Sequence, residues 1–386
     1  MKIAVLTGGG HVSALNAGIE GITKEAVDKG WDVLGALDGW EGLEKGDFVN
    51  LTKENTDSIK GFGGSILGSG RWKPYLDAVQ KTVKENEIDG VIALGGDDTL
   101  GVLDDLWEDY EVPAVGWPKT MDNDLGATYF SLGYPTAVKN AVETVLNSFD
   151  IAWTHGRIAM ISVFGRSTDW VAAGAGAYGD ADMVLPGEKP TRIDEIYEKI
   201  KEIYFENEND KGKPYATMVI AEGASIEGLE THVKRDDMHV DEFGHPKLDP
   251  NYLVSSLSDT IREKSKEDLG KQIKTAPISL TYQLRNGKPL EIDEQLGYEC
   301  GKKCVELLDN ERPGRMAIVE ENDGELEVGD ANLSEGVEVS MVSETDYIDY
   351  ENLSIRESFF DYADPFMGEK GERQIHLLDR REYKAS

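Results

Sequence analysis

Apolar runs with the pattern of buried β-strands alternate along this chain with stretches that have helical periodicity. The first repeat of this alternation is a strand over 2–7, a turn at Gly8-Gly9-Gly10 and a helix over 13–29. The alternation continues to a helix over 136–148, and a second strand–helix series begins near residue 149. Strands that alternate with helices predict parallel sheets covered on both faces. We therefore expect an α/β protein with two doubly wound domains whose sheets are mainly parallel.

Two acid-rich segments each follow one of the buried-strand patterns. Gly95-Gly96-Asp97-Asp98 follows a strand over 89–94, and Pro118-Lys119-Thr120-Met121-Asp122-Asn123-Asp124 follows a strand over 112–117. Ligands of open α/β sheets bind at the carboxyl ends of the strands, so both turns should lie in one crevice. Acids and a lysine beside glycines that let phosphate approach backbone N–H groups suit magnesium-assisted phosphoryl transfer.

Simpler interpretations of these acids are available. Asp97 or Asp98 could serve only as the N-cap of the following helix, and for Asp98 alone this alternative stays open. Asp97 together with Asp122 and Asp124 is harder to explain in that way, because carboxylates gathered at neighbouring strand ends repel one another unless a cation compensates. A Mg²⁺ ion carrying phosphate oxygens supplies that positive charge.

The glycine turn after the first strand resembles a dinucleotide-binding fingerprint only in part. That fingerprint requires G-x-G-x-x-G and an acid about 20 residues further on. Ala14 occupies the third glycine position, and Asp32 merely opens the next strand. Binding of phosphate by the turn is the better interpretation. Four arginines beside glycines or at strand ends also predict a pocket for phosphorylated ligands, because the guanidinium group binds phosphate bidentately: Arg71, Arg157, Arg166 and Arg285.

The composition excludes several classes of partner. With 40 basic and 74 acidic residues, the formal net charge is −34, which argues against binding to nucleic acid or an anionic membrane. No run approaches the roughly 20 apolar residues of a membrane span. Cys300 and Cys304, one helical turn apart, are poorly placed for a disulfide and predict a reducing cytoplasm. The acidic surface suits concentrated salt, which screens repulsion within ~3 Å at about 1 M, so we expect a halophilic cytoplasm.

Eight segments in order resemble the phosphofructokinase family, from residue 1 to about residue 310. They are the glycine turn with Asn16 downstream, Leu67–Arg71, Gly95–Asp98, Pro118–Asp124, His155–Arg157, Phe164–Arg166, Ala221–Gly223 and Tyr282–Arg285. The resemblance implies a phosphofructokinase-like fold. Its donor domain would cover 1–145 plus about 276–336, its sugar-phosphate domain 146–275, and an acidic C-terminal tail 337–386.

The resemblance also implies a role for each matching residue. Asp122 is expected as the general base toward the sugar 1-hydroxyl, Asp97 as the Mg²⁺ ligand, and Arg71 as the bridge between donor and sugar. The expected donor-binding residues are Gly9, Gly10, Gly96, Asp98 and Lys119, of which Lys119 is also catalytic. The expected substrate-binding residues are Thr120, Met121, Asp122, Arg157, Phe164, Gly165, Arg166, Glu222, Tyr282 and Arg285. Arg157 is expected to act across subunits, which implies a homodimer or homotetramer.

Two positions, Asp98 and Lys119, indicate which phosphate donor is used. Family members that use ATP usually have glycine at the position of Asp98 and commonly at that of Lys119, whereas those that use pyrophosphate resemble this chain at both. A carboxylate at Asp98 adds negative charge where a nucleotide would lie, and Lys119 can hold a small, highly charged anion. We therefore expect reversible phosphoryl transfer from pyrophosphate to fructose 6-phosphate, a step of glycolysis.

Two departures from the family pattern and two alternatives accompany this expectation. Phe164 replaces the usual methionine, and Asp169 stands where glycine is common, which leaves another ketose phosphate, such as sedoheptulose 7-phosphate, open as substrate. The nearest alternative is an ATP-dependent kinase on the same fold. The alternative from another class is a non-catalytic sugar-phosphate sensor, against which the retained Asp97, Lys119 and Asp122 argue.

Overall fold

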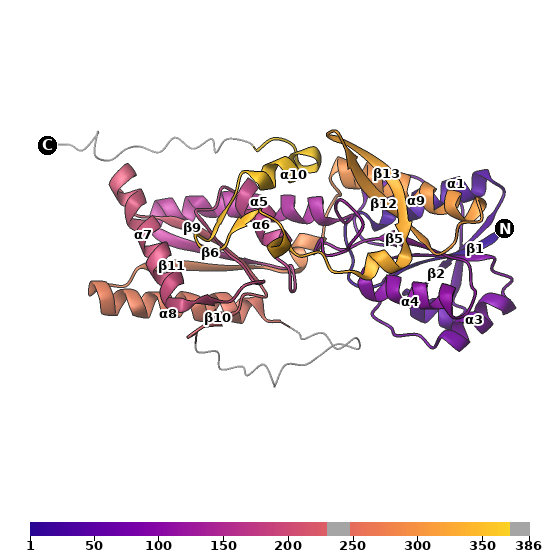
Figure 1. The fold of residues 1–386 in the computed structure, drawn as a ribbon, viewed down its shortest axis with the longest axis horizontal. Coiled ribbons are helices and arrows are strands. Elements are labelled where there is room, and N and C mark those ends of the chain that lie inside the picture. The colour runs from indigo at the N-terminus through magenta and orange to yellow at the C-terminus, as the bar shows by residue number, and fades with distance from the viewer. Residues whose placement is uncertain (230–247, 371–386) are drawn as a thin grey trace. The chain divides into compact units, whose positions relative to one another are not determined.

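The computed structural model describes residues 1–229 and 248–370. The described residues form two compact units, unit 1 with Met1–Ala137 and Arg285–Ser340, and unit 2 with 138–229, 248–284 and 341–370 (Figure 1). The expected donor domain included residues from about 276 onward, but 276–284 belong to unit 2. The reason is that strand β11 (Lys274–Leu280) pairs in parallel with β6 (Arg157–Val163) along its whole length.

Unit 1 is built on a seven-stranded sheet of order β13-β12-β5-β4-β1-β2-β3. Its strands are β1 (Lys2–Thr7), β2 (Asp32–Ala36), β3 (Phe48–Leu51), β4 (Gly90–Gly95), β5 (Ala114–Pro118), β12 (Arg315–Asn322) and β13 (Glu325–Asn332). Its helices are α1 (Leu15–Asp28), α2 (Trp40–Lys45), α3 (Leu76–Glu85), α4 (Asp97–Glu108) and α9 (Glu291–Asp309), with the short 3₁₀ helices η1 (Ile59–Gly61) and η4 (Leu333–Val337). The pairs are parallel except at the two edges, β2–β3 and β12–β13.

Alternating side chains of the central strands sort the helices of unit 1 into two layers. Val91 and Ala93 of β4 belong to one buried cluster with residues of α2, α3 and α4. Leu94 points to the opposite face, where a Cβ added to Gly18 of α1 would lie 2.8 Å from it. On that face the indole N–H of Trp117 donates to the carbonyl oxygen of Gly297 in α9 at 3.1 Å. The sheet is thus covered on both faces, as the near-continuous apolar strands predicted.

Unit 2 is built on a four-stranded parallel sheet of order β11-β6-β9-β7. Its remaining strands are β7 (Met183–Leu185), β8 (Thr191–Arg192), β9 (Ala216–Ala221), β10 (Ile226–Glu227), β14 (Ile348–Asp349) and β15 (Ser354–Ile355). Its helices are α6 (Trp170–Tyr178), α7 (Ile193–Lys211), α8 (Pro250–Leu269) and α10 (Ser358–Met367), with the short 3₁₀ helix η5 (Val342–Glu344). Helix α5 (Tyr134–His155) and the 3₁₀ helix η3 (Tyr282–Arg285) cross the unit boundary in sequence. The prediction of an α/β protein with mainly parallel sheets is confirmed.

The C-terminal segment 341–370 is part of unit 2, although the sequence carried no motif there. Tyr347 and Tyr362 stack on each other with ring centroids 5.3 Å apart, and both contact the ring of Trp170 in α6. Phe359 joins the same aromatic cluster and is fully buried. This packing explains why the segment is ordered despite its acidic composition. Residues 371–386 of the expected tail lie outside the described part of the chain.

Candidate functional site

The carboxyl ends of three neighbouring strands of unit 1 bring the predicted donor-side segments together. β1 leads into the glycine turn, β4 into Asp97 and β5 into Lys119. The N–H of Gly8 donates to the carbonyl oxygen of Leu94, and the N–H of Lys119 to that of Gly95, both at 2.9 Å. These bonds continue the strand pairing to the last residues of the strands, so the three turns begin at one edge of the sheet.

Lys119 lies in the middle of this edge, and only 2% of its surface is exposed. Its ammonium group donates to the carbonyl oxygen of Gly8 at 2.9 Å and also to that of Gly10. Gly9 lies between these carbonyls with φ of 74°, a left-handed conformation that favours glycine. The glycine turn therefore curves around the end of the lysine side chain.

The backbone N–H of Gly9 was expected to bind the phosphate donor, but it bonds within the protein. It donates to the carbonyl oxygen of Gly70 at 2.9 Å, and the carbonyl of Gly9 accepts from the hydroxyl of Ser69 at 2.7 Å. The expectation that this N–H faces a phosphate donor is thus corrected. Gly9 instead fixes the segment that carries Arg71 against the glycine turn.

Four further charged side chains act on Lys119. The pKa of Lys119 is lowered to about 7, mainly by burial and also by the positive charges of Arg285 and Arg71, while Asp122 and Asp97 oppose the shift. The structure thus brings Arg71, Asp97, Lys119 and Asp122 together, as the sequence predicted. Arg285 was expected at the sugar 6-phosphate. It also lies against the glycine turn, where a Cβ added to Gly10 would be only 2.8 Å from its guanidinium group.

Asp97 and Asp98 open helix α4, and neither is its N-cap. Gly96 occupies the N-cap position, and no side chain caps the helix there. The capping alternative that was left open for Asp98 is therefore wrong. Both carboxylates lie in the first turn, where the partial positive charge of the helix terminus favours anions.

The segment that carries Asp122 is buried and closely held. Asp122 is 5% exposed, and its backbone N–H donates to the hydroxyl of Thr120 at 3.1 Å. The side chain of Asn123 accepts from the N–H of Ser131 at 2.7 Å. Met121, expected among the substrate-binding residues, is fully buried. Its side chain belongs to the core, and its expected role in substrate binding stays a prediction.

Asp293 of α9 holds the start of helix α5, downstream of this segment, and the sequence did not reveal it. This fully buried carboxylate accepts from the N–H of Gly133 at 2.7 Å and from that of Thr136 at 2.9 Å. Burial raises the pKa of Asp293, while these hydrogen bonds and that of the Thr136 hydroxyl oppose the rise. An acid on the apolar face of α9 was the signal that could have revealed it.

In unit 2, the predicted sugar-phosphate residues gather at the ends of β6 and β9. Glu222 accepts hydrogen bonds from the N–H groups of Gly165 at 3.1 Å and Arg166 at 2.7 Å. Arg166 has φ of 51°, a conformation uncommon for arginine that points to a tightly constrained turn. The rings of Phe164 and Tyr282 meet edge to face with centroids 5.7 Å apart. Tyr282 is 65% exposed, which leaves its hydroxyl accessible to a ligand.

Arg157 stands apart from that group. It is the first residue of β6, whereas the turn with Phe164 follows the last residue of the same strand. The strand therefore separates the two ends, and Arg157 does not join the sugar-phosphate turn of its own unit. Its expected action across subunits stays a prediction.

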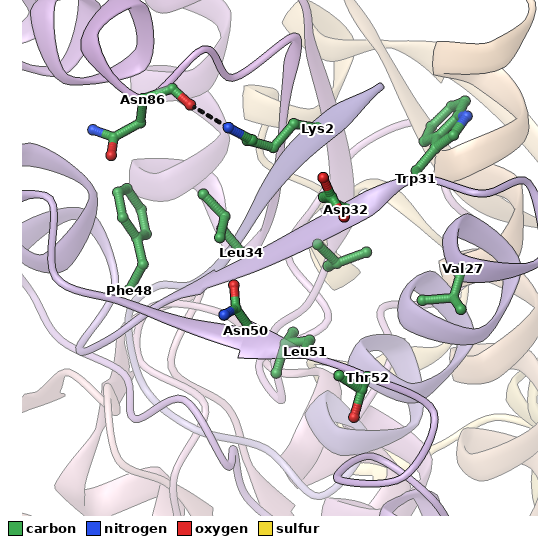
Figure 2. A pocket seen from close by; sticks show the side chains of 11 residues that line it. Lys2, Val27, Trp31, Asp32, Leu34, Phe48, Asn50, Leu51, Thr52 and Asn86 are labelled. Atoms are coloured by element: carbon green, nitrogen blue, oxygen red, sulfur yellow. Dashed lines mark hydrogen bonds between the residues drawn. The ribbon is translucent and has the colours of Figure 1, made fainter.

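Unit 1 also has a surface pocket of about 690 Å³ (Figure 2). It is lined by the amino ends of β1 and β2 and by β3, with Lys2, Asp32 and Phe48 among its walls. The ammonium group of Lys2 donates to the carbonyl oxygen of Asn86 at 2.9 Å beside it. None of the predicted site residues lines this pocket.

Known proteins resemble the chain over most of its length. A sequence model of the family "Phosphofructokinase" matches residues 2–308. The pyrophosphate--fructose 6-phosphate 1-phosphotransferase of Dictyoglomus thermophilum is 36% identical over 341 residues, which cover 87% of this chain and 94% of the relative. The ATP-dependent 6-phosphofructokinase 3 of Streptomyces coelicolor is 33% identical over 344 residues, covering 88% of this chain and 95% of the relative.

Solved structures share the fold. The pyrophosphate-dependent phosphofructokinase of Marinobacter aquaeolei superimposes with a TM-score of 0.79 at 20% identity, covering 98% of this chain and 95% of that chain. The corresponding enzyme of Nitrosospira multiformis also gives 0.79, at 18% identity, covering 96% of this chain and 92% of that chain. The match to the family sequence model, the relatives above 30% identity and the shared fold agree. The chain belongs to the phosphofructokinase family.

Proposed function

We propose that this protein transfers a phosphoryl group reversibly between pyrophosphate and the 1-hydroxyl of fructose 6-phosphate, a reaction of glycolysis. The observation that carries this proposal is the buried Lys119 at the edge of the unit 1 sheet, surrounded by Arg71, Asp97, Asp122 and Arg285. Phosphoryl transfer depends on positioning and on stabilising charge at the transferred group. Cations and carboxylates fixed in one place by backbone hydrogen bonds suit that task.

Each side chain has a distinct role in the proposed reaction. Asp122 takes the proton of the attacking sugar hydroxyl, because it is a buried carboxylate fixed by the hydrogen bond of its own backbone N–H to Thr120 and by that of the neighbouring Asn123 side chain to Ser131. Lys119 and Arg71 stabilise the negative charge that the transferred group and the leaving phosphate carry. The turn Phe164–Arg166, Glu222, Tyr282 and Arg285 bind the sugar phosphate.

A divalent cation fits the residues of the donor side. Within residues 1–229 and 248–370, no cluster of three or more His, Cys, Asp or Glu side chains could hold a metal by itself. Mg²⁺ usually keeps several waters and binds through one or two carboxylates plus the phosphates of the substrate. Asp97, a hard oxygen ligand at the turn that follows β4, provides such a carboxylate. When bound, Mg²⁺ would neutralise charge on the phosphate oxygens.

Pyrophosphate is favoured over ATP as the donor. Asp98 lies beside Asp97 in the first turn of α4, and a second carboxylate there repels the additional phosphate of a nucleotide. Lys119 provides a compact positive charge in a confined space, which suits a small anion. Relatives with either donor in their names resemble this chain, so identity alone does not separate the two.

Turnover of purified protein with pyrophosphate, Mg²⁺ and fructose 6-phosphate tests the proposal. Wild-type protein should form fructose 1,6-bisphosphate, and Asp122→Asn should lower kcat by roughly 10²–10⁴-fold with an unchanged melting curve. The control Asp105→Asn removes an exposed carboxylate from the surface of α4 and should leave kcat intact. Binding of sugar phosphate without turnover would instead support a sensor, and near wild-type turnover of Asp122→Asn would remove that residue from its role.

The assembly, environment and location of the protein belong to the same proposal. Arg157 at the amino end of β6 would complete the sugar-phosphate site of a second copy, which requires a homodimer or homotetramer. The net charge of −34 suits a salt-rich cytoplasm. Among the described residues, no helix combines the length and apolar composition needed to cross a membrane.

A further inference from the structure

Asp169 is a fully buried acid whose carboxylate does not serve the helix that it precedes. It occupies the N-cap position of α6, yet it makes no side-chain capping bond. Its carboxylate instead accepts from the N–H of Gly187 at 2.5 Å and from that of Glu188 at 3.3 Å. It also accepts from the hydroxyl of Tyr350 in the C-terminal segment at 3.2 Å. The ordinary explanation of an aspartate at this position, helix capping, therefore does not apply.

Glu188 and Asp169 bind each other reciprocally, each accepting from the backbone N–H of the other. The carboxylate of Glu188 accepts from the N–H of Asp169 at 2.8 Å, from that of Val342 at 3.0 Å and from that of Ser343 at 2.6 Å. Next to it, the ammonium group of Lys189 lies 4.0 Å from the ring centroid of Tyr350. The two acids thus join three segments that are distant in sequence: the end of the turn after β6, the loop after β7 and residues 342–350.

The turn joined in this way is the one that carries the proposed sugar-binding residues. The N–H and the hydroxyl of Thr168 both donate to the carbonyl oxygen of Gly165, at 3.1 and 3.2 Å. Glu222 holds the N–H groups of Gly165 and Arg166 at the start of the turn. At the end of the turn, Glu188 accepts from the N–H of Asp169, and the carboxylate of Asp169 binds the backbone of Gly187 and Glu188 in return. The turn is therefore held at its start by Glu222 and at its end by the reciprocal bonds of Asp169 and Glu188.

Burial favours the neutral form of an acid, and here several hydrogen bonds favour the charged form instead. Burial raises the pKa of Asp169 to about 6, and the charge of Glu188 adds to that rise, while the hydrogen bonds from Gly187, Glu188 and Tyr350 oppose it. A fully buried acid beside a second, partly buried acid is a poor way to gain stability. Their retention is better explained by the geometry that they impose on the turn.

We propose that Asp169 is a positioning residue for the sugar-phosphate turn, Phe164–Arg166. Residues 342–350 complete the support of this turn by binding Glu188 and Asp169. The inference rests on the proposed function, since it assigns a purpose to the turn Phe164–Arg166. Asp169 touches no substrate in this account. It acts by tying the end of the turn to the loop after β7 and to Tyr350, and it makes the C-terminal segment of unit 2 part of the binding apparatus.

The test compares Asp169→Asn and Tyr350→Phe with the matched control Asp182→Asn. Asp182 likewise accepts from the backbone N–H and the hydroxyl of one residue, Thr217, at 2.7 and 2.8 Å in the same unit, and it lies just before β7. Asp169→Asn should raise KM and Kd for fructose 6-phosphate about tenfold, with kcat and KM for pyrophosphate changed less than about threefold. Tyr350→Phe, which keeps the ring, should change the same two constants in the same direction by less. The control should leave both unchanged.

The outcomes separate this inference from the proposed function. Unchanged KM and Kd for the sugar phosphate in Asp169→Asn would overturn the positioning role, as would an equal loss in kcat and both KM values. If Asp169→Asn does not fold, an unaltered Tyr350→Phe enzyme would overturn it as well. Wild-type protein that binds fructose 6-phosphate without using pyrophosphate would overturn the proposed function alone, because the Kd comparison still decides the role of Asp169.

Discussion

The ammonium group of Lys119 is a buried charge at the carboxyl edge of the unit 1 sheet. It is held by the carbonyls of Gly8 and Gly10, and its surroundings lower its pKa from the ordinary 10.5 to about 7. The folded pKa lies below the ordinary value, so the charged form is lost as the pH rises through about 7. Lys119 therefore titrates in a range where an enzyme can be assayed directly.

Pyrophosphate binding should depend on pH because of this lysine. As the pH rises from about 6 to about 8.5, KM for pyrophosphate should increase, because the neutral amine no longer attracts the anion. Pyrophosphate itself titrates in this range, so Lys119→Met provides the reference profile. Steady-state kinetics of both proteins across the series would measure the difference. Parallel profiles would show that Lys119 does not titrate in the donor site.

At this scale the sequence predicted the residues that follow strands and missed those that act through tertiary contacts. Asp97, Lys119 and Asp122 follow buried strands directly, and parallel strands end at a common edge, so their proximity could be foreseen. The partner of the Gly9 N–H is Gly70, which no local pattern indicates. The burial of Asp293 likewise depends on how α9 packs.

The first turn of helix α5 is stabilised by Asp293, a residue of helix α9. This turn donates to Asp293 through Thr136, and Gly133 just before it donates to the same carboxylate. The hydroxyl of Thr136 in turn accepts from the N–H of Leu290 at 2.9 Å. The two helix termini therefore stabilise each other, and the segment with Asp122 lies immediately upstream.

Asp293→Ala should lower the free energy of unfolding by about 2–4 kcal/mol, because it leaves buried backbone donors without their acceptor. Urea denaturation followed by circular dichroism measures the change. Asp309, at the other end of α9, pairs with Lys29 at the surface, so Asp309→Ala should cost less than about 1 kcal/mol. Equal effects of the two substitutions would contradict a special role for Asp293.

The strands and helices that the pattern predicted are present, with ends shifted by a few residues. The helix expected over 136–148 runs from Tyr134 to His155, because apolar residues continue beyond its expected end. The antiparallel edge strands and the C-terminal elements were not predicted. No local pattern indicated helix α10. Its aromatic residues are buried by packing against other elements, such as Trp170 of α6, and this packing cannot be foreseen from the sequence.

For the whole molecule, the net charge of −34 opposes the capture of anionic substrates. Raising the salt concentration shortens the screening length from about 30 Å at 0.01 M to about 3 Å at 1 M, which weakens repulsion from distant carboxylates more than contacts inside the site. Activity and oligomer mass should therefore both increase between low and near-molar KCl at fixed free Mg²⁺. Kinetics together with light scattering across the series would measure both. A fully active, intact oligomer at low salt that declines steadily above it would contradict a salt-adapted surface.

The most direct test of the account is the ratio of kcat/KM for pyrophosphate to that for ATP, with fructose 6-phosphate as acceptor. The wild-type protein should prefer pyrophosphate by at least about 100-fold, because Asp98 repels the nucleotide and Lys119 holds the smaller anion. Asp98→Gly should reduce that ratio by improving the use of ATP, and Lys119→Met should reduce it by impairing the use of pyrophosphate. A wild-type protein that prefers ATP would contradict the central claim.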